Sequence, residues 1–385
     1  MLALTTGLLS SVVFAPAAEW TDLFNGRDLA NWVNVNCAPE TWSVRDGVIH
    51  CTGFPIGALR TPRQYENFEL ELEWRHLKPG GNAGIFIWAS PLASPGTPFL
   101  RSVEVQVLDH GYNADGKNEW YTTHGDVFPI HGSTMKPFGR HNGQRSFPSE
   151  ERSKPSPEWN HYRIVATNGV LRLSVNGKEV SGGENCNWRK GYIGLESEGS
   201  PVEFRNIRIR EHPSTGAGPD ASAPIEEGFF PLYNGLDLRD WQTTGEIRAR
   251  WQPADWRLVL KDNEGKPGPT LWTVGSYRNF DFIVDFKLPE KADTEQVGGG
   301  FEVGGYRVIL SENQFPGRLK PGKWQRLRVQ SHQSKRSIQL DGELAAEVEV
   351  LGAAGSQPRP IGVLAPGGGM EYANFYLRMS EAGVP

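Results

Sequence analysis

The chain has 385 residues and a formal net charge of −5, with acidic and basic residues interspersed along it. This charge pattern contains no basic patch, which argues against a nucleic-acid partner. The 45 Gly, 28 Pro and 13 Trp indicate many turns and short strands rather than long helices. The length allows two or three domains, and the internal repeat described below selects two of roughly 160 to 190 residues each.

The first residues have the pattern of an export signal. Residues 2–18 are apolar and end in Ala15-Pro16-Ala17-Ala18, which resembles a signal-peptidase cleavage site, although no Lys or Arg precedes them. The stretch is short for a membrane span, and nothing later in the chain is apolar enough to be one. We therefore predict a signal peptide over residues 1–18, a periplasmic or secreted location and no membrane span.

A ten-residue signature occurs twice in the chain. Residues 23–32 (LFNGRDLANW) return as residues 232–241 (LYNGLDLRDW), and three shorter matches follow in the same order. Ordered matches over such a span predict a duplicated domain rather than a short-period repeat. We predict a first domain over 19–212, a linker rich in Pro, Gly, Ser and Ala over 213–226, and a second domain over 227–381.

Strand signals dominate both halves. Residues 68–74, 171–175 and 204–209 alternate apolar and charged or polar side chains, as half-buried strands do. The dipeptides Asn168-Gly169 and Asn176-Gly177 are typical of hairpin turns and would join neighbouring strands into a meander. The predicted fold class is all-β, with two tandem jelly-roll β-sandwich domains.

The three cysteines leave two alternatives open. Cys37 and Cys51 bracket a predicted hairpin and could pair, which would leave Cys186 alone. All three could equally be unpaired core or loop residues. Their spacing does not resemble a zinc site.

The strand over residues 102–109 carries the first candidate site residues. Glu104 and Gln106 are two positions apart and share one face, whereas the valines between them take the other face. Burying such a polar face without partners is costly, so we predict that it lines a polar cleft. A bulge after Gln106 would bring Asp109 to the same side. The corresponding strand of the second copy, residues 306–312, lacks the Glu-x-Gln pair.

Neighbouring segments add further candidates. Asn82 follows a Gly-rich turn and becomes Gly299 or Gly300 in the second copy, where Lys287 replaces Arg75. Glu196 and Glu198 share a strand face, and residues 362–367 of the second copy have no acid. Because the scaffold can do without these residues, they are functional candidates; the alternative for the two glutamates is an ordinary solvated strand surface.

The segment from about residue 108 to 157 is long, irregular and rich in Gly, Pro, His and Asn. Such an insertion in a compact domain usually builds a site or a lid. A histidine near its unperturbed pKa could act as a general base. A divalent metal is a further alternative, although the spacings match no recognised site, and no other cofactor is predicted. The candidates in this segment are His110, His124, Asp126, His131 and His141.

Taken together, these residues resemble the 3-keto-disaccharide hydrolase family. The landmarks are residues 23–26 with Trp32, 68–70, 81–84, 104–109, 158–160, 194–199 and 204–207. The resemblance covers residues 19 to 211, whereas residues 227–381 share only scaffold landmarks. It implies a concanavalin A-like jelly roll. Many members have Leu-Gln-x-His-Gly where this chain has Leu195-Glu196-Ser197-Glu198-Gly199, and Asn-Ser-Gly where it has Asn82-Ala83-Gly84.

The resemblance implies cleavage of 3-keto-glycosides. A ketone at C3 acidifies the C2 proton, so a base can remove it while the C1 substituent leaves, and water then adds back. The ligand would be a carbohydrate, and a partner sugar oxidoreductase could install the ketone. The implied roles are Glu104 as acid/base, Gln106 and Asn82 as hydrogen-bond donors, Arg75 and Asp109 as sugar anchors, and His124 or His131 as a loop contribution, with Glu196 and Glu198 lining the substrate site.

Two other functions compete with this one. A non-catalytic, lectin-like protein would bind sugar without turnover, because the same jelly roll also hosts binding modules. A retaining β-glucanase would need a close pair of carboxylates, typically from a Glu-x-Asp-x-x-Glu strand. Gln106 and Asp109 occupy the second and third positions of that pattern, so the pair is absent.

Overall fold

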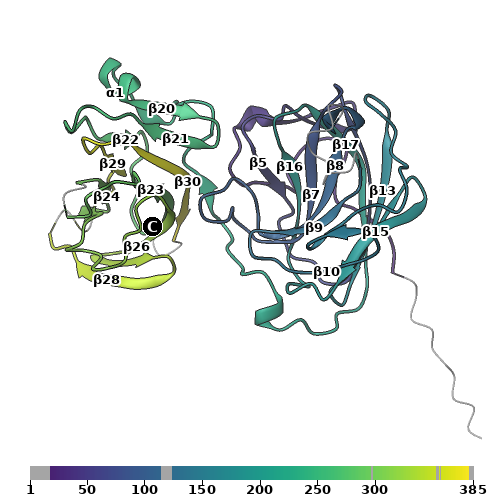
Figure 1. Cartoon of the computed structure of the whole chain (residues 1–385). Coiled ribbons are helices and arrows are strands. Elements are labelled where there is room, and N and C mark those ends of the chain that lie inside the picture. The colour runs from purple at the N-terminus through teal and green to yellow at the C-terminus, as the bar shows by residue number, and fades with distance from the viewer. Residues whose placement is uncertain (1–17, 114–123, 296–297, 353–354, 356, 381–385) are drawn as a thin grey trace, which may run out of the picture.

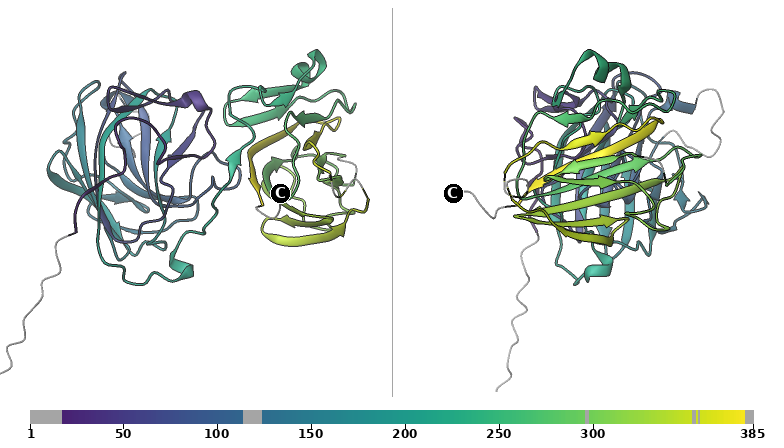
Figure 2. Two further views of the ribbon diagram at one scale, coloured as in Figure 1. Left: turned by 180° about the vertical axis from the view of Figure 1, so that it is seen from behind. Right: turned by 90° about the vertical axis from the view of Figure 1, so that its left-hand side faces the viewer.

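The computed structural model describes residues 18–113, 124–295, 298–352, 355 and 357–380. Within these residues the strands form four sheets, which pair into two β-sandwiches lying side by side (Figures 1 and 2). This confirms the predicted fold class. The predicted signal peptide lies outside the described residues except for its last residue, and no described helix is long and apolar enough to cross a membrane. The described helices are η1 (Pro39–Thr41), η2 (His110–Asn113), η3 (Pro219–Ala221) and α1 (Gly245–Arg250).

Two sheets, numbered 1 and 2, build the first sandwich. Sheet 1 contains, in spatial order, β10 (Lys136–Pro137), β15 (Lys178–Glu184), β14 (Val170–Val175), β13 (Asn160–Thr167), β6 (Phe68–His76), β17 (Val202–Glu211), β4 (Val48–Cys51) and β3 (Trp42–Arg45), with β1 (Thr21–Asp22) beside β17. Sheet 2 contains β11 (His141–Asn142), β12 (Arg145–Ser146), β9 (Val127–Ile130), β8 (Ser102–Leu108), β7 (Asn82–Ala89), β16 (Tyr192–Ser197), β5 (Gly57–Arg60) and β2 (Val33–Asn34).

Sheets 3 and 4 build the second sandwich. Sheet 3 contains β20 (Trp251–Ala254), β21 (Arg257–Leu260), β30 (Met370–Met379), β23 (Phe280–Lys287), β26 (Trp324–His332), β27 (Lys335–Leu340) and β28 (Glu343–Glu349), with β18 (Phe230–Pro231) beside β30. Sheet 4 contains β19 (Trp241–Gln242), β22 (Leu271–Thr273), β29 (Gly362–Leu364), β24 (Gly300–Val303) and β25 (Tyr306–Ile309).

The two sandwiches share a strand order. The run β15-β14-β13-β6-β17-β4-β3 of sheet 1 has its counterpart in β28-β27-β26-β23-β30-β21-β20 of sheet 3. Likewise β8-β7-β16-β5-β2 of sheet 2 corresponds to β25-β24-β29-β22-β19 of sheet 4. The shared order supports our proposal that the domain was duplicated.

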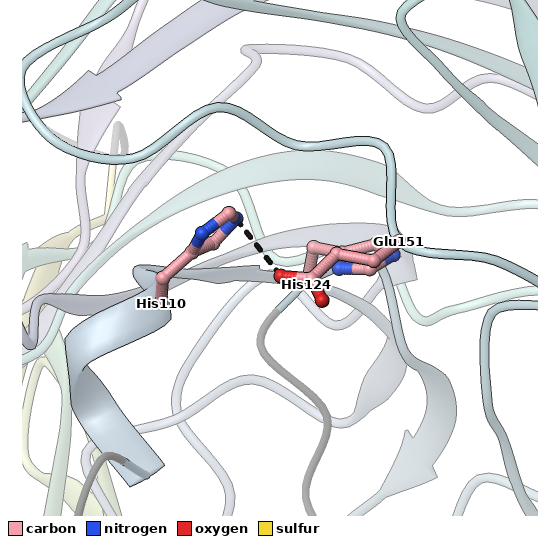
Figure 3. A group of neighbouring side chains, drawn as sticks. All are labelled: His110, His124 and Glu151. Carbon is pink, nitrogen blue, oxygen red and sulfur yellow. Dashed lines mark ion pairs between the residues drawn. The ribbon is translucent and has the colours of Figure 1, made fainter.

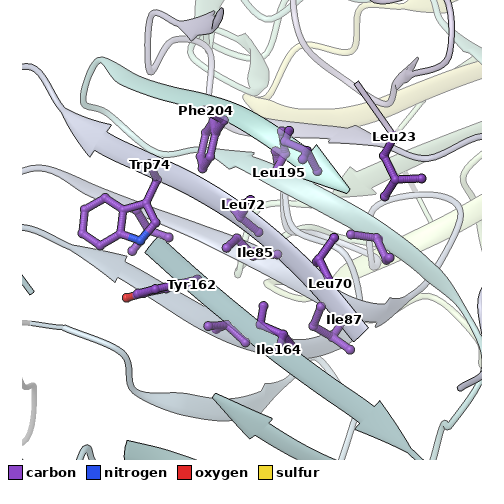
Figure 4. Packing of buried hydrophobic residues seen from close by; sticks show 14 of the residues in the cluster. Leu23, Leu70, Leu72, Trp74, Ile85, Ile87, Tyr162, Ile164, Leu195 and Phe204 are labelled. Atoms are coloured by element: carbon purple, nitrogen blue, oxygen red, sulfur yellow. The ribbon is translucent and has the colours of Figure 1, made fainter. Parts of the chain in front are cut away.

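Period-two alternation produces the core of the first sandwich. On β6, Leu70, Leu72 and Trp74 are buried and face the other sheet, while the residues between them are more exposed. Ile85 and Ile87 meet them from β7 (Figure 4). The predicted two-residue turns are present, because Asn168 and Asn176 have positive φ between paired strands.

The cysteines take the unpaired alternative. Cys37, Cys51 and Cys186 are all buried and free. Burial raises the pKa of the Cys51 thiol to about 11, so this group is protonated and acts as a small apolar side chain.

The β7–β8 loop, residues 90–101, joins the two sandwiches. The backbone N–H of Ala93 donates to the Tyr376 hydroxyl (3.3 Å), and that of Gly96 donates to Asp285 Oδ2 (2.9 Å). Arg326 bridges from the second domain to the Ala93 carbonyl (2.8 Å). A shared apolar cluster continues the contact, in which Phe86 and Leu92 pack with Phe229, Ile283 and Tyr376. The second domain is therefore held against the outer face of sheet 2.

The predicted linker lies along the first domain. Ser214 and Thr215 donate side-chain hydrogen bonds to the Glu66 carboxylate (2.5 and 2.9 Å), and Ala223 N–H donates to the Lys190 carbonyl (2.8 Å). These contacts fix the chain before it enters the second domain at β18.

Candidate active site

The outer face of sheet 2 gathers acidic side chains from separate strands. Glu104 and Gln106 on β8 point away from the core, because Val103, Val105 and Val107 take the inner positions. Strand β7 lies between β8 and β16, and pairing places Phe86 opposite Glu104 and Gly84 opposite Gln106. Pairing of Leu195 with Ile85 in turn brings Glu196 beside Gly84.

Gly84 leaves room for two carboxylates to approach each other. A β-carbon at this residue would lie 2.8 Å from Glu104 Oε1 and 2.8 Å from Glu196 Oε2. Both oxygens therefore reach the same small volume above the glycine. Any side chain at this position would force the two carboxylates apart.

Burial and mutual repulsion raise the pKa values of the carboxyl groups of Glu104, Glu196 and Glu198. Burial, followed by the charge of Glu198, raises the pKa of Glu104 to about 8. Burial also raises the pKa of Glu198 to about 7, although hydrogen bonding with Glu196 and Asn82 and the charge of Arg145 oppose the shift. The pKa of Glu196 is raised as well, by burial and by the two neighbouring carboxylates. The cluster thus holds protons at neutral pH.

Glu196 also has an unsatisfied atom. Its Oε2 is buried and has no hydrogen-bond partner among the described residues, while Glu196 is 1 % exposed. A buried polar atom without a partner is costly, and such atoms are often completed by a ligand. Since this oxygen is directed to the space above Gly84, a sugar hydroxyl there would satisfy it.

Gln106 connects the cluster to the insertion. Its amide nitrogen donates to Asn82 Oδ1 (2.6 Å), and its Oε1 accepts from Arg145 (2.7 Å). Arg145 also binds Asp126 Oδ2 (2.6 Å) and lies over the Phe128 ring. The Gln106 amide is therefore occupied within the protein, which corrects the expectation that it donates to the sugar. Gln106 is a positioning residue: it holds Asn82 Oδ1, so that the Asn82 amide nitrogen faces the Glu198 carboxylate.

Arg145 is a site residue that the sequence did not indicate. It comes from β12, one of several short strands in a segment that we expected to be irregular. Nothing in its sequence surroundings separates it from other arginines, because its role arises from pairing between β12 and β9. Tyr112 is a second such residue, since burial and the charge of Glu198 raise its pKa.

Two histidines of the insertion, His110 and His124, form a separate group with Glu151. His110, His124 and Glu151 each offer one ligand atom, and these atoms lie within 4.8 Å of one another (Figure 3). His110 Nε2 lies 2.7 Å from Ser153 Oγ and 3.3 Å from Glu151 Oε1, and His124 Nε2 lies 2.8 Å from the Glu150 carbonyl. Metal-binding histidines commonly use one nitrogen in this way. Two imidazoles and a carboxylate form a donor set that suits zinc or manganese.

Two predicted site residues, Arg75 and His131, lie elsewhere. Arg75 is on β6 of sheet 1, whose outer face it shares with Glu203 (2.6 Å) and Trp159, so it does not meet Glu104. Successive residues of a strand face opposite sides of the sheet, and because Trp74 faces the core, Arg75 faces outward. His131 follows β9 at the end of β8 away from Gln106, where it stacks on Phe99.

Asp109 has a structural role instead of the predicted anchoring role. Its oxygens accept backbone N–H groups from Gly80 (2.7 Å), Gly111 (2.9 Å) and Ser156 (2.7 Å). The bulge that would have brought Asp109 to the face of Glu104 is absent, because β7 and β8 pair regularly from Asn82–Leu108 to Ile87–Val103. Asp109 therefore ties the insertion to the turn before β7.

The matching face of sheet 4 carries none of this chemistry. Following the strand order and pairing, Arg307 takes the place of Glu104, Ile309 that of Gln106, and Leu364 that of Glu196. Gly300 is the equivalent of Gly84 in the second domain. The equivalent of Asn82 is therefore Gly298, two residues earlier, and not Gly299 or Gly300 as the sequence suggested. The acidic cluster belongs to the first domain alone among the described residues.

Comparison with known proteins points to carbohydrate chemistry. Residues 19–210 match the family of 3-keto-alpha-glucoside-1,2-lyase-like domains. A curated protein of Bacteroides thetaiotaomicron, described as a 3-keto-disaccharide hydrolase, is 25 % identical and covers 50 % of this chain and 79 % of its own length. A solved structure from Parabacteroides distasonis, described as a candidate glycosyl hydrolase, is 26 % identical with a TM-score of 0.39, and covers 50 % of this chain and all of its own. A carbohydrate-binding module from Bacillus subtilis is 13 % identical with a TM-score of 0.33, and covers 47 % of this chain and 96 % of its own.

Proposed function

Because residues 19–210 of this chain belong to the family of 3-keto-alpha-glucoside-1,2-lyase-like domains, we propose that the protein is an enzyme that cleaves 3-keto-glycosides at the glycosidic bond. The observation that carries the proposal is the convergence of Glu104 and Glu196 above Gly84, with Glu198 beside them. Carboxyl groups whose pKa values lie near neutrality can both give and accept protons at physiological pH.

Glu198 is the base in this mechanism. Its raised pKa, about 7, leaves a large ionised fraction at neutral pH and makes the ionised form a stronger base than an ordinary glutamate. It removes the proton from C2, which the C3 ketone has acidified. The electron pair of the C2–H bond then forms the C1=C2 double bond as the C1–O bond breaks.

Glu104 is the acid. With a pKa of about 8 it retains its proton at pH 7 and donates it to the departing glycosidic oxygen. The enone then takes up water: ionised Glu104 accepts a proton from the water that adds to C1, and protonated Glu198 returns a proton to C2. The sum is hydrolysis, and both glutamates end in their starting states. Because the base must be ionised and the acid protonated, and the pKa values of both groups are raised, turnover should be highest near neutral pH and fall on either side.

Two side chains support the developing negative charge on the C3 oxygen. Gln106 donates to Asn82 Oδ1 and the Asn82 amide nitrogen donates to the Glu198 carboxylate, which leaves the second N–H of that amide to donate to the sugar. Arg145 supplies a positive charge on the same face, where Asp126 and Gln106 fix its guanidinium. Preorganised donors of this kind stabilise an enolate more than water does, because they need no reorientation.

His110, His124 and Glu151 form a candidate divalent-cation site in the same insertion. Their donor set and the hydrogen-bonded ring nitrogens support this assignment. A cation bound there would act as a Lewis acid towards a sugar oxygen. The three side chains themselves contribute binding and orientation, and they tie η2 to the segment before β13.

The natural setting follows from the substrate. The apolar stretch at residues 2–18 supports export to the periplasm or beyond, where sugars are first processed. A sugar oxidoreductase would supply the ketone, because the proposed reaction starts from a sugar that is already oxidised at C3.

The test is incubation of the full chain with a 3-keto-glucoside and with the same glucoside unoxidised. We expect release of the aglycone from the keto-sugar alone. Glu104→Gln keeps the size of the side chain but cannot transfer the proton, so the rate should fall about 100- to 10,000-fold. Binding of both sugars without release from either would contradict the proposal and support the lectin-like alternative.

A further inference from the structure

A cavity lies between the two domains, beside the β7–β8 loop. Its volume is about 260 Å³, near the lower end of the range for small-molecule sites. The first domain lines it with Leu92, Arg101 and Trp188, and the second with Ile283, Arg326 and Gln339. Because loop 90–101 is hydrogen-bonded to the second domain, the cavity is a fixed part of the fold.

The positive charges in this cavity are not fully balanced. Arg326 is paired with Asp285, and Arg328 with Asp281 and Glu226. Arg101 is the exception, because no described carboxylate pairs with it. Its Nε is buried without a hydrogen-bond partner, and burial alone lowers the pKa of its guanidinium.

Arg101 is also held in a fixed orientation. Its guanidinium lies 3.8 Å from the centre of the Trp188 ring, a stacked contact that restricts the side chain. The plane of a stacked guanidinium still presents N–H groups at its edge, and these match a carboxylate in a two-bond arrangement. The walls around it are largely apolar, with Pro91, Leu92 and Ile283, which suits the C–H faces of a sugar ring.

We propose that this interdomain cavity binds a sugar acid, with Arg101 holding the ligand carboxylate. The site is separate from the carboxylate cluster, because none of its lining residues belongs to that cluster. Such a site would retain an acidic saccharide, or the acidic end of a longer one, beside the catalytic face. The second domain thereby supplies one wall of a binding site.

Isothermal titration of the full chain at low ionic strength tests this directly. The probes are D-glucuronate, its neutral analogue D-glucuronamide, D-glucose and benzoate. We expect one glucuronate per chain, and at least tenfold weaker binding of glucuronamide and glucose. These ligands have nearly the same shape, so the comparison isolates the carboxylate without altering the protein. It needs no turnover, so its outcome is independent of the proposed reaction.

Variants then locate the site. Arg101→Met should weaken glucuronate binding about 10- to 100-fold, because a charge-assisted pair of hydrogen bonds is lost. Arg45→Met removes an exposed arginine of the first domain and should leave the affinity unchanged. Three results would overturn the proposal: equal binding of glucuronate and glucuronamide, unchanged affinity in Arg101→Met, or tighter binding of benzoate than of glucuronate, which would assign the cavity to aromatic carboxylates.

Discussion

At the scale of single residues, the candidate site depends on a glycine as much as on its acids. Gly84 is the point at which Glu104 and Glu196 converge, and its backbone is not in the left-handed region, so an alanine would fit the main chain. The acids themselves are buried and partly protonated, which costs stability. Sites of this kind retain such groups for function.

Gly84→Ala should therefore separate the carboxylates without unfolding the domain. The new methyl group would lie 2.8 Å from an oxygen of each, so both side chains must move. We expect kcat to fall about 10- to 100-fold with a small change in Tm. Gly245→Ala is the matched control, because a β-carbon there has no atom within 4 Å. Equal kcat values for the two variants would contradict the assigned geometry.

The raised pKa of Glu104 also predicts a pH dependence of stability. Its pKa rises from the ordinary value of 4.5 to about 8 on folding, so the folded chain holds a proton that the unfolded chain releases between these values. The free energy of unfolding of the wild type should thus fall as pH rises through this window. Glu104→Gln has no carboxyl group at this position to ionise. The free energy of unfolding of this variant, relative to that of the wild type, should therefore increase by roughly 2 to 4 kcal/mol between pH 5 and pH 8.

Urea unfolding at both pH values measures this difference. Glu158→Gln, at an exposed glutamate of the same domain, is the control and should show no such gain. If the stabilities of Glu104→Gln and the wild type changed in parallel with pH, Glu104 would ionise in the folded state as an ordinary glutamate, and its role as the acid would be lost.

At the scale of elements, β8 and the insertion after it carry the site in different ways. The faces of β8 could be predicted because period-two alternation is local, and Glu104 and Gln106 lie on the outer face as expected. Arg75 was misplaced because alternation does not say to which sheet β6 belongs. Arg145 and Gly84 were missed because their roles depend on pairing between strands far apart in the sequence.

The insertion also makes the cation proposal testable. His110, His124 and Glu151 should bind one divalent ion per chain, which mass spectrometry of the dialysed protein can count after addition of zinc or manganese. Binding to the folded state should raise the Tm. His110→Ala should lose the ion, whereas His141→Ala, at an exposed histidine of the same insertion, should keep it. Full activity and unchanged Tm after EDTA treatment would count against the cation.

At the scale of the whole molecule, the second domain acts on the site through the β7–β8 loop. This loop joins the two strands that carry Gly84 and Glu104, and the second domain holds it through Asp285 and Arg326. The apolar cluster that includes Phe86, the cross-strand neighbour of Glu104, continues into the second domain. Loss of this contact should therefore loosen the catalytic face.

Gly96→Ala should release the loop. A β-carbon there would lie 2.2 Å from Trp324 Cγ, and the residue has a φ of +70°. We expect a Tm lowered by several degrees and kcat reduced severalfold. Gly317→Ala has nearly the same φ, +65°, but no atom within 4 Å, so it controls for backbone strain. Equal effects of the two changes would show that docking does not support the site.

The most direct test of the account is a kinetic isotope effect with a 3-keto-glucoside carrying deuterium at C2. Removal of this proton by Glu198, as the glycosidic bond breaks, predicts a primary effect of about 2 to 7 on kcat/KM. When the unlabelled sugar reacts in heavy water, exchange of the proton on Glu198 with solvent before it returns to C2 also predicts incorporation of deuterium at C2 of the product. Cleavage with no isotope effect and no exchange at C2 would instead mean direct displacement at C1, and the assignment of Glu198 and Glu104 would be contradicted.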